Sequence, residues 1–377
     1  MKIALLTDGI YPYAIGGMQK HSFTLARELA RKGHTVYLFH CNQSKYDASK
    51  LEFFTEEERK YIKPYLISFP KKQYFPLHYI YESYKYSEAI YKELKPILGE
   101  LDFVIAQGFC GWALLNEKDI KRPPVAVHFH GLEMFQDIPS LKAKLSRGFL
   151  QMAVKKNLSK ADIAISLGGK ITTILSSMVD KNKIWEIPLG IEESWLAKEI
   201  SPASDKVRFA FIGRYERRKG IPELNAAIQQ LPANGKFSFE FIGAIPEANR
   251  ISAPNIKYHG EIASEAEIRQ ILSNCDVLVC PSHAEGMPTV IMEAMACALA
   301  IIATDVGAVS MLVNENNGWL IESPDSDNIF REMTAAMEDM ELQRKKETSH
   351  VHVGNSFLIG SVTNKLITGI KGFINKD

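Results

Sequence analysis

Short apolar runs alternate with longer amphipathic segments along almost the whole of this chain. The first unit has an apolar run at residues 3–7, a helical pattern that stops at Gly33, and a second apolar run at residues 36–39. A strand, a helix and a second strand in this order form a βαβ unit with parallel strands. The alternation therefore predicts an α/β fold built on parallel sheets.

The unit repeats in two series, and residues 193–206 between them lose the periodicity. A chain of 377 residues is also longer than one ordinary hydrophobic core supports. We therefore predict two Rossmann-like doubly wound domains that face each other across a cleft, with a long helix at 357–373. Strands are expected at residues 3–7, 36–39, 103–106, 125–129, 163–166 and 184–187, and then at 209–212, 239–242, 277–280, 300–303 and 319–321.

Composition and charge narrow the function classes without choosing one. Hydrophobic residues make up 46% and charged residues 24%, which is typical of a folded globular protein. Residues 1–195 hold 27 Lys and Arg against 21 Asp and Glu, whereas residues 196–377 hold 18 against 23. The basic half suits an anionic acceptor or an anionic membrane surface, and scatter between two solvated surfaces explains it equally well.

Compartment signals favour the cytoplasm. No stretch approaches the ~18 apolar residues of a spanning helix, so we expect a soluble protein or one attached only at a membrane surface. The five cysteines form no C-x-x-C pair, and an odd count without a framework fits a reducing cytosol.

The most informative stretch is residues 280–296, where a predicted strand gives way to a loop and then to a helix that opens at Pro288. A helix start offers free backbone N–H groups and a positive dipole end, which suit a diphosphate. Gly286 allows the backbone to approach a ligand closely. Glu285 in the loop and Glu293 in the helix can accept hydrogen bonds from hydroxyls at two places on one ligand. Taken alone, Glu293 is more often a solvated helix residue.

A cationic cluster follows the first predicted strand of the second series, at residues 211–221. Arg214 stands at the end of the strand and Lys219 at a helix start, so the two can neutralise a diphosphate leaving group without a metal. We expect Arg217 and Arg218 to be solvated.

Two further features lie at strand ends of the first series. Gly16 and Gly17 form a loop that can expose N–H groups to phosphate or sugar, although many such pairs are only turns. No G-x-G-x-x-G run follows the first strand, which counts against a nicotinamide enzyme. His130, before Gly131, can bond a sugar hydroxyl from the cleft side, or can be structural.

Two segments remain with competing interpretations. Asp325 and Asp327 form a D-x-D triplet, but they precede a helical pattern, and we interpret Asp325 as a helix cap rather than a metal ligand. Residues 51–95 interleave aromatic and basic side chains, as at 71–75 and 79–86. They suit an acceptor groove, a membrane interface, or amphipathic helices packed on the sheet.

Together these clusters resemble the retaining glycosyltransferases of family four, which have the GT-B fold. The order and spacing of the matching pieces hold over nearly the whole chain. The pieces are Gly16-Gly17 with His21 four residues on, Gly33-His34-x-Val36, His130-Gly131, Pro188 to Glu192, Gly213-Arg214 with Lys219-Gly220, His259-Gly260, and Pro281-Ser-x-x-Glu-Gly-x-Pro-x-x-x-x-Glu-Ala294.

The resemblance implies an acceptor-binding domain at 1–195, a nucleotide-sugar-binding domain at 196–355, and a final helix at 356–377 that crosses back to the first domain. It implies that Arg214 and Lys219 hold the diphosphate, that Glu293 holds the ribose, and that Glu285 holds the donor sugar. It further implies that His130 of the first domain acts together with Arg214, Lys219 and Glu285 of the second domain as the catalytic residues. The remaining donor-binding positions are Gly16, Gly17, Ile262, Gly286, Met287, Pro288 and Thr289.

Such enzymes usually need no metal and no cofactor, since the nucleotide sugar is a co-substrate. Four positions depart from the family pattern and leave the donor sugar open: Gln19, Leu189, Ala308 and Met311.

The resemblance favours a metal-independent, retaining hexosyl- or N-acetylhexosaminyl-transferase. A UDP-sugar is the favoured donor. The acceptor would be a glycan or a lipid-linked molecule in cell-envelope or extracellular polysaccharide synthesis, and no nucleic-acid partner is expected. A nucleotide-sugar epimerase of similar fold and a non-catalytic sugar-nucleotide-binding subunit are the alternatives. The sequence leaves open the linkage, the oligomeric state, and whether residues 51–95 bind membrane or acceptor.

Overall fold

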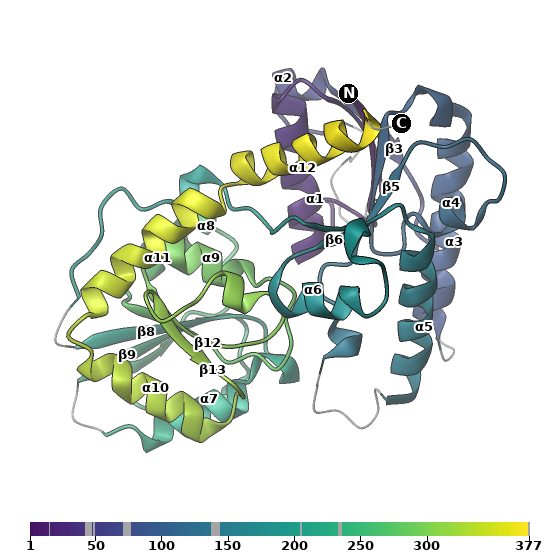
Figure 1. The fold of residues 1–377 in the computed structure, drawn as a ribbon. Coiled ribbons are helices and arrows are strands. Elements are labelled where there is room, and N and C mark those ends of the chain that lie inside the picture. The colour runs from purple at the N-terminus through teal and green to yellow at the C-terminus, as the bar shows by residue number, and fades with distance from the viewer. Residues whose placement is uncertain are drawn as a thin grey trace.

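The computed structural model has two α/β domains that lie side by side and are bridged by the C-terminal helix (Figure 1). The structure describes the whole chain except residues 15, 42–46, 48–49, 71–76, 137–143, 204–205, 233–235 and 376–377. The predicted aromatic and basic run at 71–75 therefore lies outside the described residues.

The first domain is built on a seven-stranded parallel sheet with the order β3-β2-β1-β4-β5-β6-β7. The order reverses between β1 and β4, which creates a crevice at the carboxyl ends of these strands where ligands bind in such sheets. Its strands are β1 (Lys2–Leu6), β2 (Thr35–His40), β3 (Ile62–Leu66), β4 (Phe103–Gln107), β5 (Val125–His128), β6 (Ile163–Ser166) and β7 (Ile184–Glu186).

The second domain repeats the design with six parallel strands in the order β10-β9-β8-β11-β12-β13. Here the order reverses between β8 and β11, so the loops after these two strands meet. The chain connects the sheets through residues 187–206. The strands are β8 (Val207–Ile212), β9 (Phe237–Ile242), β10 (Ile256–Tyr258), β11 (Val277–Cys280), β12 (Ala300–Thr304) and β13 (Gly318–Ile321).

These two sheets confirm the predicted fold class, and each predicted strand is present. The sequence missed β3 and β10, which are edge strands. Edge strands are exposed on one side, and β3 has only one fully buried residue, Ile62, so neither shows the continuous apolar run of a central strand.

The helices cover the sheets, and α12 returns to the first domain, where it packs along α1 (Figure 1). Val362, Leu366 and Ile370 of α12 join Ile3 and Leu5 of β1 in one apolar cluster, so burial of apolar surface holds the returning helix in place. The helices are α1 (Gly17–Arg31), α2 (Glu56–Arg59), α3 (His78–Leu94), α4 (Trp112–Asn116), α5 (Lys144–Lys160) and α6 (Gly169–Ser176), then α7 (Ile221–Gln230), α8 (Glu265–Leu272), α9 (Thr289–Ala296), α10 (Ser326–Glu338), α11 (Leu342–Ser356) and α12 (Ile359–Ile374).

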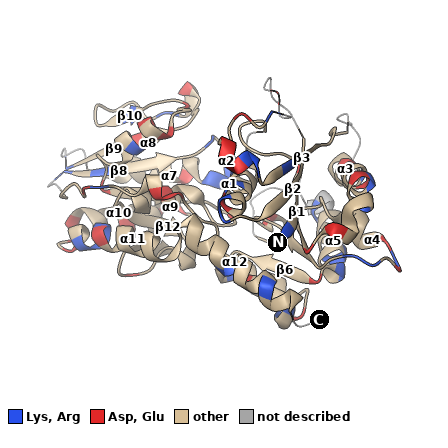
Figure 2. Cartoon of the chain, turned by 90° about the horizontal axis from the view of Figure 1, so that it is seen from above, with Lys and Arg blue, Asp and Glu red and all other residues tan. Residues whose placement is uncertain are grey.

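Basic and acidic residues are both spread over the two domains (Figure 2). Among the described residues, no helix combines the length and the apolar character needed to span a bilayer. The five cysteines, all among the described residues, are buried and form no disulfide.

Candidate active site

Glu285 lies in the loop between β11 and α9, and two cations hold its carboxylate. Lys219 Nζ donates to Glu285 Oε1 at 2.5 Å, and an Arg218 guanidinium nitrogen donates to Oε2 at 3.3 Å. Both cations come from the 3-10 turn at Arg217–Lys219, which follows β8. Because β8 and β11 adjoin where the strand order reverses, the fold brings these two distant motifs together.

The arginines of this turn differ from the prediction. Arg218, which we expected to be solvated, is largely buried against Glu285 and Glu216. Arg214 instead has 78% of its side chain exposed and pairs with Glu216 at 3.1 Å. Arg217 is half-exposed on Glu223. Only a folded loop decides which of several neighbouring arginines turns inward, so the expectation that Arg218 is solvated was wrong.

Gly286 lies at the contact between the two domains. A Cβ atom added there would lie 1.8 Å from the carbonyl oxygen of His130, which belongs to the first domain. The Gln136 side chain of the same domain donates to the carbonyl oxygen of Glu285 at 2.7 Å. Only glycine fits so close a backbone approach. The loop that carries Glu285 is therefore directly opposite His130.

Glu293 projects from α9 and meets a cation that the sequence did not reveal. Lys20, in the first turn of α1, donates to Glu293 Oε1 at 3.2 Å and also pairs with Glu265 of α8 at 2.8 Å. Burial raises the pKa of Glu293, and the charge of Lys20 partly offsets the rise. Glu293 is thus a buried, paired carboxylate rather than a solvated helix residue. A single lysine one turn into α1 gives no sequence signal for this pairing.

The start of α1 and the start of α9 share a small cavity of about 40 Å³. Gly17, Lys20, Thr289 and Glu293 are among its lining residues. Gly17 has open space where a Cβ would be, whereas a Cβ on Gly16 would meet the Gln19 side chain. The structure therefore places the Gly-Gly loop and the helix start of the main motif at one cavity.

The remaining predicted donor-site residues flank this loop. Pro288 is the N-cap of α9, as its position predicts. Met287 is buried, and its Sδ accepts from the Leu189 N–H at 3.2 Å, so its side chain contacts the interdomain connection. Ile262 is half-buried in the loop between β10 and α8.

A larger cavity of about 330 Å³ opens in the first domain beside His130. Asp8 and Glu133 supply carboxylates to its wall, and the segment 51–95 supplies aromatic rings such as Tyr79 and Tyr86. Aromatic faces and carboxylates together suit a sugar, whose ring has an apolar face and whose hydroxyls need acceptors. This part of segment 51–95 therefore lines a cavity next to the Glu285 loop.

Asp8 is held in this wall at a cost to stability. Burial raises the pKa of its carboxyl to about 6, although the Gln19 amide donates to it at 2.6 Å. An Asp with a raised folded-state pKa stays protonated to a higher pH than in the unfolded chain. It therefore destabilises the fold progressively as the pH rises from about 4 to about 6. A buried carboxylate kept in a cavity at such a cost is typical of a functional site.

We therefore expect Asp8→Asn to stabilise the protein at pH 7.5 by about 1–3 kcal/mol, and to have little effect near pH 4. Urea unfolding of wild type and variant at both pH values measures this difference. Gln19→Leu is the matched control: it removes the donor to Asp8 and is expected to lower stability at pH 7.5. An equal gain from Asp8→Asn at both pH values would contradict the assignment.

Two further groups bear on metal binding. Asp325 accepts from the Asn328 N–H at 2.9 Å and caps α10, which confirms its interpretation as a cap. Among the described residues, one group of side chains has metal-ligating atoms close together: His21, His128 and His130. This group lies apart from the D-x-D triplet.

Comparisons with known proteins agree with this arrangement. A family model described as Glycosyltransferase Family 4 matches residues 15–195, and one described as Glycosyl transferases group 1 matches residues 206–339. The boundary between the two matches falls in the connection between the two sheets.

Individual proteins that resemble this chain have low sequence identity to it. The chain is 26% identical over 241 residues to a Bacillus subtilis glycosyltransferase assigned to teichuronic acid biosynthesis, TuaC, with 61% of this chain and 59% of the relative covered. It is 26% identical over 207 residues to the N,N'-diacetylbacillosaminyl-diphospho-undecaprenol alpha-1,3-N-acetylgalactosaminyltransferase of Campylobacter jejuni, with 53% and 54% covered. The matches thus span little more than half the length of these relatives. The structure of Anabaena Alr3699/HepE in complex with UDP-glucose superposes with a TM-score of 0.70 at 18% identity, over 99% of this chain and 100% of that one.

Proposed function

The chain belongs to the family-four glycosyltransferases and has the GT-B fold, and from this premise we propose that it transfers a hexose or N-acetylhexosamine from a nucleoside-diphosphate sugar. A UDP-sugar is the favoured donor. The acceptor is a glycan or a lipid-linked sugar in cell-envelope or extracellular polysaccharide synthesis, and the enzyme works at the cytoplasmic side of the membrane.

The observation that carries this proposal is the Glu285 carboxylate, which accepts hydrogen bonds from Lys219 and Arg218. Lys219 and Arg218 place two cations next to a backbone loop that leads into α9, and the N-terminus of that helix attracts a diphosphate. In our proposal the diphosphate lies against Lys219 and the start of α9, and Arg214 turns in from its exposed position. Glu285 then accepts hydrogen bonds from hydroxyls of the donor sugar.

The ribose would bind Glu293, which requires Lys20 to release that carboxylate. Gly17 and His130 would meet the donor from the first domain, and the main chain of residues 286–289 would line the sugar and the phosphates. Two cations and a helix start can stabilise the charge that develops on the leaving diphosphate, so we propose that transfer needs no metal.

The acceptor would occupy the 330 Å³ cavity, which opens beside His130 and the Glu285 loop. Attack from the side of the leaving group would retain the anomeric configuration, with the diphosphate taking the proton of the acceptor hydroxyl. UDP-glucose in the similar Anabaena structure supports the choice of nucleotide, and the diphospho-undecaprenol substrate named for the Campylobacter relative supports a lipid-linked acceptor. The basic balance of residues 1–195 fits work at an anionic membrane surface.

Donor binding tests the proposal first. We expect UDP and UDP-sugars to raise the melting temperature of EDTA-treated protein, because a ligand that binds only the folded state stabilises it. GDP- and ADP-sugars are the matched comparison. Equal shifts from all nucleotides would contradict the choice of uridine.

Product analysis by NMR then separates the possible activities. Transfer with the donor anomer retained supports the proposal, and transfer with the anomer inverted overturns the retaining mechanism. A new epimer of the UDP-sugar without acceptor identifies an epimerase. Tight binding without any product across a broad acceptor panel identifies a binding subunit.

A further inference from the structure

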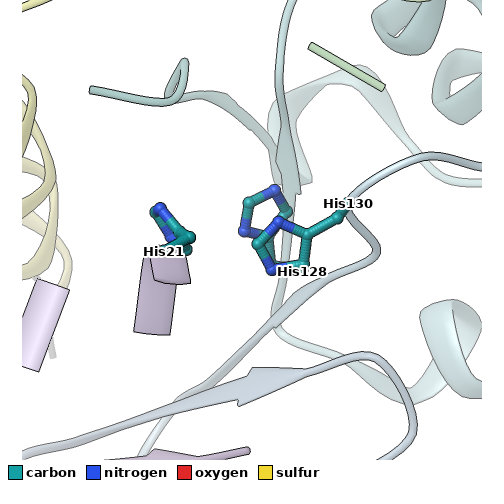
Figure 3. Close-up of side chains that lie close together, drawn as sticks. All are labelled: His21, His128 and His130. Atoms are coloured by element: carbon teal, nitrogen blue, oxygen red, sulfur yellow. The ribbon is translucent and has the colours of Figure 1, made fainter. Parts of the chain in front are cut away.

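Three histidines from two separate segments meet at the interface of α1 with the end of β5 (Figure 3). His21 is in α1, His128 is the last residue of β5, and His130 follows two residues later. The ring centroids of His128 and His130 are 4.0 Å apart, and that of His21 lies 5.5 and 5.0 Å from them. One ring nitrogen from each residue lies within 4.8 Å of the others.

The hydrogen bonds at the cluster leave ligand atoms available. The Gln107 Oε1 atom lies 2.7 Å from His130 Nε2, so an Nε2–H group that donates to this oxygen leaves the lone pair on Nδ1. His128 Nε2 is buried without a hydrogen-bond partner in the described part of the chain. A buried polar atom without a partner is costly, and a metal ion bound to this nitrogen removes that cost.

Three imidazoles from two segments suit zinc and similar divalent cations. A tetrahedral zinc ion with bonds of about 2.0–2.1 Å separates its nitrogen ligands by roughly 3.4 Å. Because the ring nitrogens lie within 4.8 Å of one another, each ring has to move by at most roughly 1 Å. His21 also lines the cavity that Gly17 and Glu293 share, and this cavity can supply water or an anion as the fourth ligand.

We propose that His21, His128 and His130 form a binding site for a zinc-type divalent cation, and that filling it inhibits sugar transfer. The first part of this proposal, metal binding, rests on the histidine geometry alone. The second part, inhibition of transfer (the inhibitory half), rests on the proposed function, in which His130 meets the donor. Once its ring is bound to a metal, His130 no longer has a free nitrogen for that contact, and its carbonyl group against Gly286 is fixed in place.

Cobalt binding tests the site directly. EDTA-treated protein titrated with Co²⁺ is expected to show the intense visible absorption of a four-coordinate cobalt site at one equivalent per chain, and Zn²⁺ should abolish it by competition. His128→Phe keeps a ring in the core but removes a ligand, and His21→Gln removes a ligand from the other segment. Both variants are expected to weaken Co²⁺ binding by about 10- to 100-fold or more. Removing a residue that only hydrogen-bonds to a metal ligand already causes a loss of about this size.

His34→Gln is the matched control, because it removes a histidine of the same domain outside the cluster and should keep the absorption. Circular dichroism confirms that each variant is folded. The site is overturned if wild type lacks the absorption, or if folded His128→Phe and His21→Gln both retain it.

Inhibition is measured separately as sugar transfer with and without saturating Zn²⁺. We expect Zn²⁺ to stop transfer by wild type, EDTA to restore it, and His128→Phe to be insensitive. Transfer that continues unchanged with Zn²⁺ bound overturns the inhibitory half. If cobalt binds as expected and no donor supports transfer, the metal site stands and the proposed function fails.

Discussion

Replacing Glu285 by glutamine is expected to lower kcat for sugar transfer by about 10²–10³-fold, or about 3–4 kcal/mol in the transition state. The carboxylate accepts from Lys219 and Arg218 in the structure, and in our proposal it also accepts from the donor sugar. Glutamine keeps the size of the side chain but loses the charge that holds both cations. Steady-state kinetics with the donor identified by thermal shift, at saturating acceptor, measures the loss.

Lys219→Ala is expected to cause a loss of similar size, because it removes the closer of the two cations from the same carboxylate. The double variant should lose little more than either single variant, since residues that act as a unit are not additive. Arg217→Ala is the matched control: Arg217 belongs to the same turn but pairs with Glu223 at the surface, so activity should stay within about threefold. Wild-type activity in folded Glu285→Gln would remove Glu285 from the proposed site.

Much of the fold was predictable because central strands of a parallel sheet are buried on both faces and so are apolar throughout. Phe209 and Val277 belong to such strands, and both were placed correctly. The edge strands β3 and β10 escaped because their residues are partly exposed, and their pairing depends on a neighbour already in place. The sheet order, which brings the turn after β8 next to the loop after β11, was not predicted and comes from the structure.

Long-range pairings of charged side chains were not predictable. The carboxylate of Glu285 was recognised from its motif, but its partner Arg218 was mistaken for a solvated residue. Lys20 reaches Glu293 across the interface of two domains and leaves no local pattern. The three-histidine group unites positions 21, 128 and 130. The sequence singled out His130 for its place at a strand end and His21 only as part of the family pattern, and it did not bring the three together. Such contacts depend on tertiary geometry, which residue spacing does not encode.

A buried ion-pair network at the base of the second sheet belongs to this unpredicted class. Asp276, just before β11, accepts from the Arg208 backbone and guanidinium at 2.9–3.0 Å, and Lys346 Nζ of α11 donates to it at 2.8 Å. Lys346 also donates to the Ser201 carbonyl oxygen at 2.8 Å and is only 1% exposed. Burial alone would raise the pKa of Asp276, but Arg208 and Lys346 hold it below its usual value. The network thus ties β8, β11 and α11 together.

Asp276→Ala is expected to destabilise the protein by about 3–5 kcal/mol, because it leaves the Lys346 ammonium buried without its counter-charge. At about 2–4 °C per kcal/mol, the melting temperature should fall by roughly 10 °C. Lys346→Met should cost less, since Asp276 keeps Arg208, and adding it to Asp276→Ala should recover part of the loss because no unpaired lysine remains. Asp327→Ala, which removes an exposed carboxylate of α10, is the control and should change stability by less than about 0.5 kcal/mol.

Asp276 precedes β11 whereas Glu285 follows it, so the network and the site lie at opposite ends of the strand. Asp276→Ala should therefore keep the wild-type kcat at a temperature where it stays folded. If Asp276→Ala loses no more stability than Asp327→Ala, the buried network does not hold the second domain together.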